Sequence, residues 1–287
     1  MQAEPSLAHD TAQDLNRPVL HLSGPRLTRS FETLVERSED HGGIESYIAG
    51  LRFKSSVIQE ALSPERLLSL SEADILGISA FMASVRRRIG PWVAEAGIQP
   101  ARQLITVLLD GATDAANADE RFADFCASFP EDKAHRWVQD FAAEILHAVH
   151  PEQYPLMTRW VWDRTANSGV LREIWHSEDI DRITLDIPDG YQTHLMLREE
   201  LSQFLASNGV FRDMLFYVDL LCAQIYADYI NEQGGTFLRT DFSSEQDPMQ
   251  YTRRMLGLDG VDPETGRTRA KGADGKPIVL DASVARY

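Results

Sequence analysis

Apolar residues recur at intervals of three and four positions along most of the chain, which is the spacing of one face of an α-helix. Helices are expected at residues 30–39, 44–62, 64–70, 71–92, 99–112, 119–128, 132–149, 156–165, 192–207 and 210–232, with a shorter segment around 171–175. Ser71 is placed to cap helix 71–92, and Gly90-Pro91 should end or kink it. We therefore expect a mainly α fold, a single helical domain of about eight to ten helices.

Strand signals are weak by comparison. Residues 182–187 alternate with period two and end at a Pro-Asp-Gly turn, so they are the best strand in the chain. Residues 1–26 lack periodicity and are expected to form a flexible arm before a helical domain at 27–256. Residues 257–287 are rich in Gly, Asp, Lys and Arg, which predicts a flexible or extended tail with a short strand at 277–280. At most one short strand or hairpin is therefore expected.

Composition narrows the class of protein. The 287 residues are 43% hydrophobic and 25% charged, as in an ordinary soluble globular protein, and their formal net charge is −16. Such a charge repels phosphate backbones, so nucleic-acid binding is not expected. No membrane span is expected, because the most apolar stretch, 210–230, holds four charged residues, and no secretory signal is visible. The two cysteines have no CxxC partner, which favours a reducing cytoplasmic location.

Two Glu-x-x-His motifs are the sharpest catalytic pattern in the sequence. Glu144 with His147, and Glu173 with His176, have the spacing with which helical bundles hold two iron or manganese ions. A helical projection turns His147 away from the apolar face of helix 132–149, and the second pair also lies opposite its apolar neighbours. His147 is therefore expected to point outward, and both motifs are expected to lie on solvated helix faces. We therefore predict no cofactor, and keep a di-iron or other metal site as the alternative.

A second feature is the concentration of tryptophan and histidine between residues 135 and 176, which hold four of the five tryptophans and four of the eight histidines. Trp and Arg are frequent energetic anchors of interfaces, and they also stack on flat ligands. The alternative is that the aromatic residues fill a core while the arginines pair with nearby carboxylates. The residues expected to bind a partner or ligand are His150, Tyr154, Arg159, Trp160, Trp162 and Arg164.

Two aspartates are candidate acid–base residues. Asp219 lies on the flank of the most apolar helix, where a carboxylate needs a partner and takes a perturbed pKa, although a structural salt bridge explains it as well. Asp163 follows the Arg159-Trp160-Val161-Trp162 run and would join it in an interhelical pocket.

Familiar catalytic signatures are absent from the sequence: it contains no phosphate-binding glycine loop, no GxSxG elbow and no HExxH helix. The leading hypothesis is therefore an accessory or regulatory protein that binds a protein partner through the Trp/Arg-rich surface. The alternative is an enzyme or small-ligand binder with an interhelical pocket, with or without a metal.

Overall fold

Helices dominate the computed structural model, which describes residues 17–237, 249–262, 264–272 and 275–280. These residues form twelve α-helices and one two-stranded hairpin, which confirms the mainly α class; α4 and α10 are single turns. The helices are α2 (Gly24–Ser38), α3 (Gly43–Ala61), α4 (Pro64–Leu67), α5 (Glu72–Ser79), α6 (Ile89–Ala96), α7 (Ile98–Leu109), α8 (Ala118–Ala127), α9 (Trp137–Val149), α10 (Val170–Glu173), α11 (Tyr191–Ser207), α12 (Met214–Phe237) and α13 (Gln250–Met255). Short 3₁₀ turns occur at Glu39–His41 and Ile180–Arg182, and the hairpin pairs β1 (Arg267–Lys271) with β2 (Pro277–Val279).

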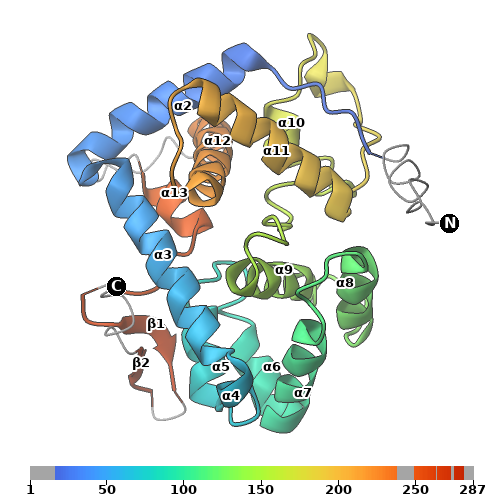
Figure 1. Cartoon of the computed structure of the whole chain (residues 1–287), viewed down its shortest axis with the longest axis vertical. Helices are drawn as coiled ribbons and strands as arrows, with labels where there is room; N and C mark the ends of the chain where they lie inside the picture. Colours follow the sequence, from blue (N-terminus) through green and yellow to red (C-terminus); the bar gives the residue numbers. More distant parts are fainter. Residues whose placement is uncertain (1–16, 238–248, 263, 273–274, 281–287) are drawn as a thin grey trace, which may run out of the picture.

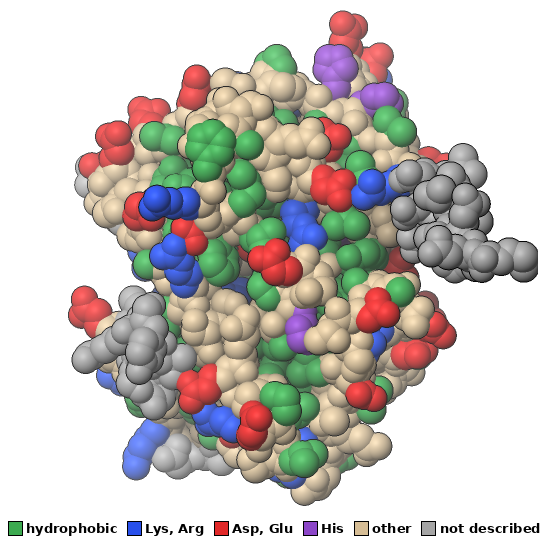
Figure 2. All heavy atoms as spheres, viewed as in Figure 1, with side chains coloured by type: hydrophobic (Ala, Val, Ile, Leu, Met, Phe, Trp, Pro, Cys, Tyr) green, Lys and Arg blue, Asp and Glu red, His purple; other side chains and the backbone are tan. Residues whose placement is uncertain are grey.

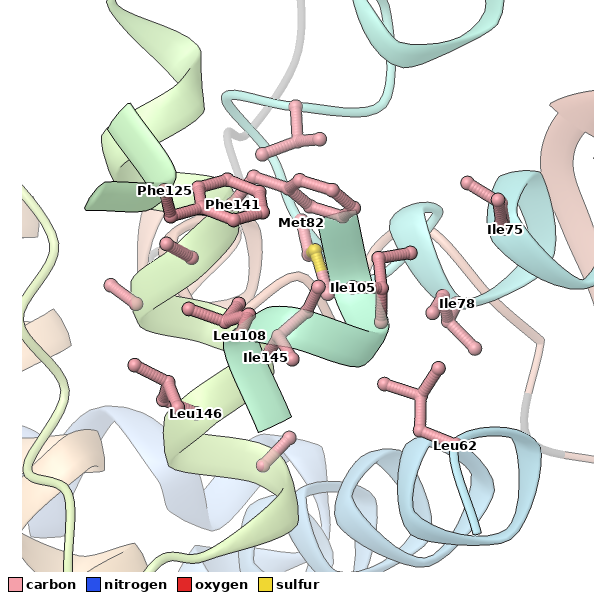
Figure 3. Close-up of a cluster of buried hydrophobic side chains, with 14 of the residues drawn as sticks. Leu62, Ile75, Ile78, Met82, Ile105, Leu108, Phe125, Phe141, Ile145 and Leu146 are labelled. Atoms are coloured by element: carbon pink, nitrogen blue, oxygen red, sulfur yellow. The ribbon is translucent and has the colours of Figure 1, made fainter. Parts of the chain in front are cut away.

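The helices form two packed groups joined along α3. In Figure 1 helix α3 descends from the group of α2, α10, α11, α12 and α13 to the group of α4 to α9. Each group has its own buried apolar cluster. In the lower cluster, side chains from α5, α7, α8 and α9 converge, with Ile78, Ile105, Phe125 and Ile145 among them (Figure 3). Because α9 and α12 belong to different groups, polar residues on their facing sides meet between two cores.

The helix expected at 71–92 is interrupted. Its start is as predicted, because Ser71 and Asp74 form a reciprocal capping box at the start of α5. The helix nevertheless ends at Ser79, and α6 begins only at Ile89. Pro91 did not end the second helix, because it lies in the first turn, where a missing N–H breaks no intrahelical hydrogen bond.

Two other expected elements are absent from the described residues. Residues 156–165 form turns after Pro155 and no helix. Residues 182–187 are not a strand, because side chains take the place of a partner strand. The amide of Asn167 accepts from the Leu185 backbone N–H and donates to the Ile183 carbonyl, to which Arg172 also donates.

The described part of the expected C-terminal tail packs on the helical body. Apolar side chains of the hairpin contact the buried clusters around α5. Gly257 has a φ of +75°, and a Cβ added to it would lie 1.5 Å from the carbonyl oxygen of Phe81. Arg86 and Asp259 form a bidentate ion pair across the same contact. Glycines that suggest flexibility in the sequence therefore allow close backbone approach here.

The described part of the expected N-terminal arm is also held. Leu22 forms an isolated β-bridge with Trp175, and Arg17 pairs with Glu199. Residues 1–16 of that arm, and 281–287 of the expected tail, lie outside the described residues.

Acidic side chains are spread over the molecular face in Figure 2, interspersed with basic and apolar ones, and do not gather into one patch. No described helix is both long enough and apolar enough to cross a bilayer.

Candidate ligand-binding cleft

Helix α9 carries three ionisable side chains on its polar side, and all three are buried. Asp140 is 3% exposed, Glu144 3% and His147 8%. The expectation that His147 points away from the protein is therefore wrong. The helical projection was sound, but the side opposite the lower apolar cluster is covered by α3 and α12 instead of water. The polar side of α9 thus forms the centre of the molecule.

Glu144 is paired with a lysine from α3. The Lys54 Nζ donates to Glu144 Oε2 over 2.6 Å and to the Leu256 carbonyl over 3.1 Å. The two side chains are only 7% and 4% exposed. Burial raises the pKa of Glu144, and the charge and hydrogen bond of Lys54 offset only part of that effect. The carboxyl is therefore easier to protonate than an exposed glutamate.

His147 is paired with Asp219, which identifies the partner that this aspartate needs. The Nε2 atom of His147 lies 2.8 Å from Asp219 Oδ2, and its Nδ1 lies 2.9 Å from the Tyr154 carbonyl oxygen. Because a carbonyl oxygen can only accept, Nδ1 carries a hydrogen. Burial lowers the pKa of His147, but the charge and hydrogen bond of Asp219, with smaller contributions, leave it raised overall. Asp219 therefore stabilises the imidazolium form.

Lys54, His147 and Asp219 line a common cavity of about 20 Å³. That volume has room for about one water molecule. The cavity brings a cation from α3, a histidine from α9 and an anion from α12 together below the surface.

On its other side Glu144 faces a much larger opening, which we call the Arg/Trp cleft. Its volume is about 590 Å³, within the range of small-molecule sites. It is lined by Ala83, Ser84, Arg136, Asp140, Glu144, Arg159, Trp160, Asp163, Ala166, Ser168, Tyr226, Ile230, Tyr251, Arg254 and Met255. Trp160 and Tyr226 have ring centroids 6.0 Å apart, and Tyr229 lies 5.6 Å beyond Tyr226. Half-buried aromatic rings therefore form part of the wall.

Two of the cleft carboxylates are held by arginines. Asp140 accepts from Nη2 and Nε of Arg159, at 2.7 and 3.3 Å, and from the backbone N–H of the same residue. Asp163 accepts from Arg136 at 2.9 Å and from the Ala166 backbone N–H at 2.8 Å. Both carboxylates are therefore compensated and fixed in place.

Arg254 is different, because it forms no ion pair with any residue that the structure describes. With Lys54 counted as the partner of Glu144, three acidic lining residues face four cations. Among the described residues, the cleft lining together with Lys54 thus carries one positive charge in excess, on a chain whose net charge is −16.

The residues expected to bind a partner are divided between the cleft and the cores. Arg159 and Trp160 line the cleft, whereas Tyr154 and Trp162 are completely or almost completely buried, with exposed fractions of 0% and 1%. The indole of Trp162 donates to the Ile187 carbonyl. These two aromatic residues pack the interior and cannot belong to an open binding surface.

His150 and Arg164 lie away from the cleft. His150 stacks loosely on Tyr154, and burial, together with the charge of Arg121, lowers its pKa. Arg164 is exposed and pairs with Asp186. The alternative in which Arg159 and Arg164 pair with nearby carboxylates matches both contacts.

The four residues of the Glu-x-x-His motifs do not meet. Glu144 and His147 are occupied by Lys54 and Asp219, while His176 is exposed beyond α10. Within the described ranges, no group of three or more His, Cys, Asp or Glu side chains is arranged to hold a metal ion.

Sequence reasoning missed several residues of the site. They are Lys54, Arg136, Asp140, Tyr226, Tyr251 and Arg254. The sequence does contain a signal for Lys54. This residue lies between Leu51 and Ile58 on the apolar stripe of its helix, where a lysine needs a buried acid as its partner. The others come from separate segments that only the fold brings together.

Comparisons of the chain with models of protein families, with curated proteins and with solved structures found no match. The Arg/Trp cleft is therefore the feature of the molecule that bears on function.

Proposed function

We propose that the protein binds a small organic anion with a planar ring in the Arg/Trp cleft. The observation that carries the proposal is the guanidinium of Arg254, which has no ion-pair partner among the described residues, beside the rings of Trp160 and Tyr226. A guanidinium binds carboxylate, sulfonate and phosphate oxygens through charge-assisted hydrogen bonds, and indole and phenol rings stack on flat molecules. The excess of one positive charge matches a ligand with one negative charge.

The binding test uses naphthalene-2-sulfonate, which joins a planar ring system to one negative charge that does not titrate near neutral pH. Two matched probes separate the contributions: sulfate has the charged oxygens without the ring, and 2-naphthol has the ring without the charge. Isothermal titration calorimetry should show binding of naphthalene-2-sulfonate, and weaker binding of both other probes. Equal binding of 2-naphthol would contradict a site selective for anions.

The variant Arg254→Ala should weaken binding of naphthalene-2-sulfonate by about tenfold, because a hydrogen bond to a charged group contributes about 1.5 kcal/mol or more. Arg29→Ala is the matched control. Arg29 is an exposed arginine on α2 that does not line the cleft, so its loss changes the net charge equally. The same loss of affinity in both variants would mean that the effect is a general one of charge.

Binding of a protein partner is the other function expected from the sequence, and it stays a prediction. The burial of Tyr154 and Trp162 removes two of the residues proposed for that surface. The position of Arg159 and Trp160 in a cleft of about 590 Å³ favours a small molecule. Whether the bound molecule is chemically changed depends on the ionisable groups that line the cleft, Glu144 among them.

A further inference from the structure

Glu144 differs from the other two acids of the cleft in the way it is held. Asp140 and Asp163 each accept hydrogen bonds from an arginine and from a backbone N–H. Glu144, in contrast, accepts from Lys54 alone among the described residues. Burial also raises the pKa of Glu144, so this carboxyl takes up a proton more readily than an exposed glutamate.

Behind Glu144 a chain of buried polar groups surrounds the water-sized cavity. Lys54 contacts Glu144 on one side and lines the water-sized cavity on the other, and His147 and Asp219 line the same cavity. A proton is also held between His147 Nε2 and Asp219 Oδ2, 2.8 Å apart. One end of this chain opens to the cleft at Glu144, and the other ends at the Tyr154 carbonyl oxygen.

We infer that Glu144 is the acid–base group of the Arg/Trp cleft, that it takes up a proton when an anion binds there, and that Lys54 positions it. The inference rests on the proposed function. An anion beside a carboxylate disfavours the charged form of that carboxylate, so binding favours its protonation. The Oε–H of Glu144 is then able to pass its proton to a basic atom of the bound molecule, and Lys54 stabilises the carboxylate that remains.

The charged and titratable groups around Glu144 agree with this direction. Those in or beside the cleft are Arg136, Asp140, Arg159, Asp163, Tyr226, Tyr251 and Arg254; those on the buried side are Lys54, His147, Asp219 and Cys222. The arginines other than Arg254 are already paired with aspartates. An added negative charge in the cleft therefore acts on Glu144, which accepts a hydrogen bond from Lys54 alone among the described residues. Burial has already raised the pKa of this carboxyl.

The test measures protons taken up when naphthalene-2-sulfonate binds. Calorimetric titrations near pH 7 in Bis-Tris and in Tris, two cationic buffers with different ionisation enthalpies, give the net number of protons exchanged. Because the probe does not titrate, every exchanged proton comes from a group on the protein. Wild-type protein should take up protons, to at most one per bound ligand.

The variant Glu144→Gln should retain binding within about threefold and lose the uptake, because Gln can still accept from Lys54 but cannot be protonated. Glu120→Gln, at an exposed position on α8 outside the cleft, should behave as wild type. Binding by Glu144→Gln with unchanged uptake would overturn the inference and leave the proposed function intact. Absence of binding to wild type would overturn both.

Infrared difference spectroscopy of wild-type protein gives a readout that needs no variant. Addition of naphthalene-2-sulfonate should produce a carboxylic acid C=O band, and that band should shift in protein labelled with ¹³C-glutamate. The absence of a labelled carboxylic acid band in the liganded protein would overturn the assignment to Glu144, even if Glu144→Gln fails to fold.

Discussion

The buried ion pair of Lys54 and Glu144 allows a quantitative test of how Glu144 is held in the Arg/Trp cleft. In Lys54→Met the carboxyl of Glu144 stays 4% exposed but loses its only hydrogen-bond partner among the described residues. Removal of one partner of a buried ion pair costs about 3–5 kcal/mol, because the remaining charge is left without compensation. We expect the free energy of unfolding of Lys54→Met to fall by that amount at pH 7.

The double variant Lys54→Met/Glu144→Leu is the matched control. Replacement of a whole buried ion pair by apolar side chains is often neutral, since the desolvation cost of both charges disappears with their attraction. We therefore expect the double variant to lie within about 1 kcal/mol of wild type. Urea unfolding followed by tryptophan fluorescence measures the stability of wild type, Lys54→Met, Glu144→Leu and the double variant, which together form a double-mutant cycle.

The pH dependence tests the same reasoning independently. Without Lys54 the pKa of Glu144 in the folded state should rise further above its unfolded value near 4.5, since burial already raises it in wild type. A raised folded pKa stabilises below the unfolded pKa, and this contribution is lost as pH rises through the folded pKa. The loss in free energy of unfolding caused by Lys54→Met should therefore be small near pH 4.5 and large at pH 7. A deficit below about 1 kcal/mol at pH 7, or one independent of pH, would refute a buried and uncompensated Glu144.

Three further outcomes follow from other contacts. Gly257→Ala should lower the free energy of unfolding by more than about 2 kcal/mol, because its φ is +75° and a Cβ would overlap the Phe81 carbonyl; a neutral effect in urea unfolding would contradict this contact. His147→Gln should lose more stability at pH 6 than at pH 9, because Asp219 helps to raise the pKa of His147, and a raised pKa stabilises below about 6.5 and loses effect as pH rises. Burial raises the pKa of Cys126 to about 11, so iodoacetamide at pH 8 should alkylate it about 200-fold more slowly than a free cysteine; mass spectrometry that finds fast labelling would contradict its burial.

Most of the helices could be predicted from the sequence because their apolar stripes face a core. Helices α3, α7, α8 and α11 begin and end close to the expected positions, whereas α2 begins six residues before the expected start and α12 begins and ends later than expected. The failures are caused by contacts with parts of the chain outside the segment concerned. The segment at 182–187 has the alternation of a strand, but its backbone partners are side chains of Asn167 and Arg172, which no local pattern contains. The glycines at 257 and 260 indicate a flexible chain only until a backbone lies against them.

The site was harder to predict because a buried polar face and an exposed polar face have the same period. Asp140, Glu144 and His147 lie within about 60° of one another around the axis of α9. Such a stripe was interpreted as solvated, since it lies away from the apolar side. It faces Lys54 and Asp219 instead, and each of these is a buried ionisable residue among apolar neighbours on its own helix. A polar stripe on one helix and isolated opposite charges on the apolar faces of others are therefore complementary signals. Read together, they predict a buried polar layer between two cores, which is where this chain places Glu144, the acid that opens to the cleft.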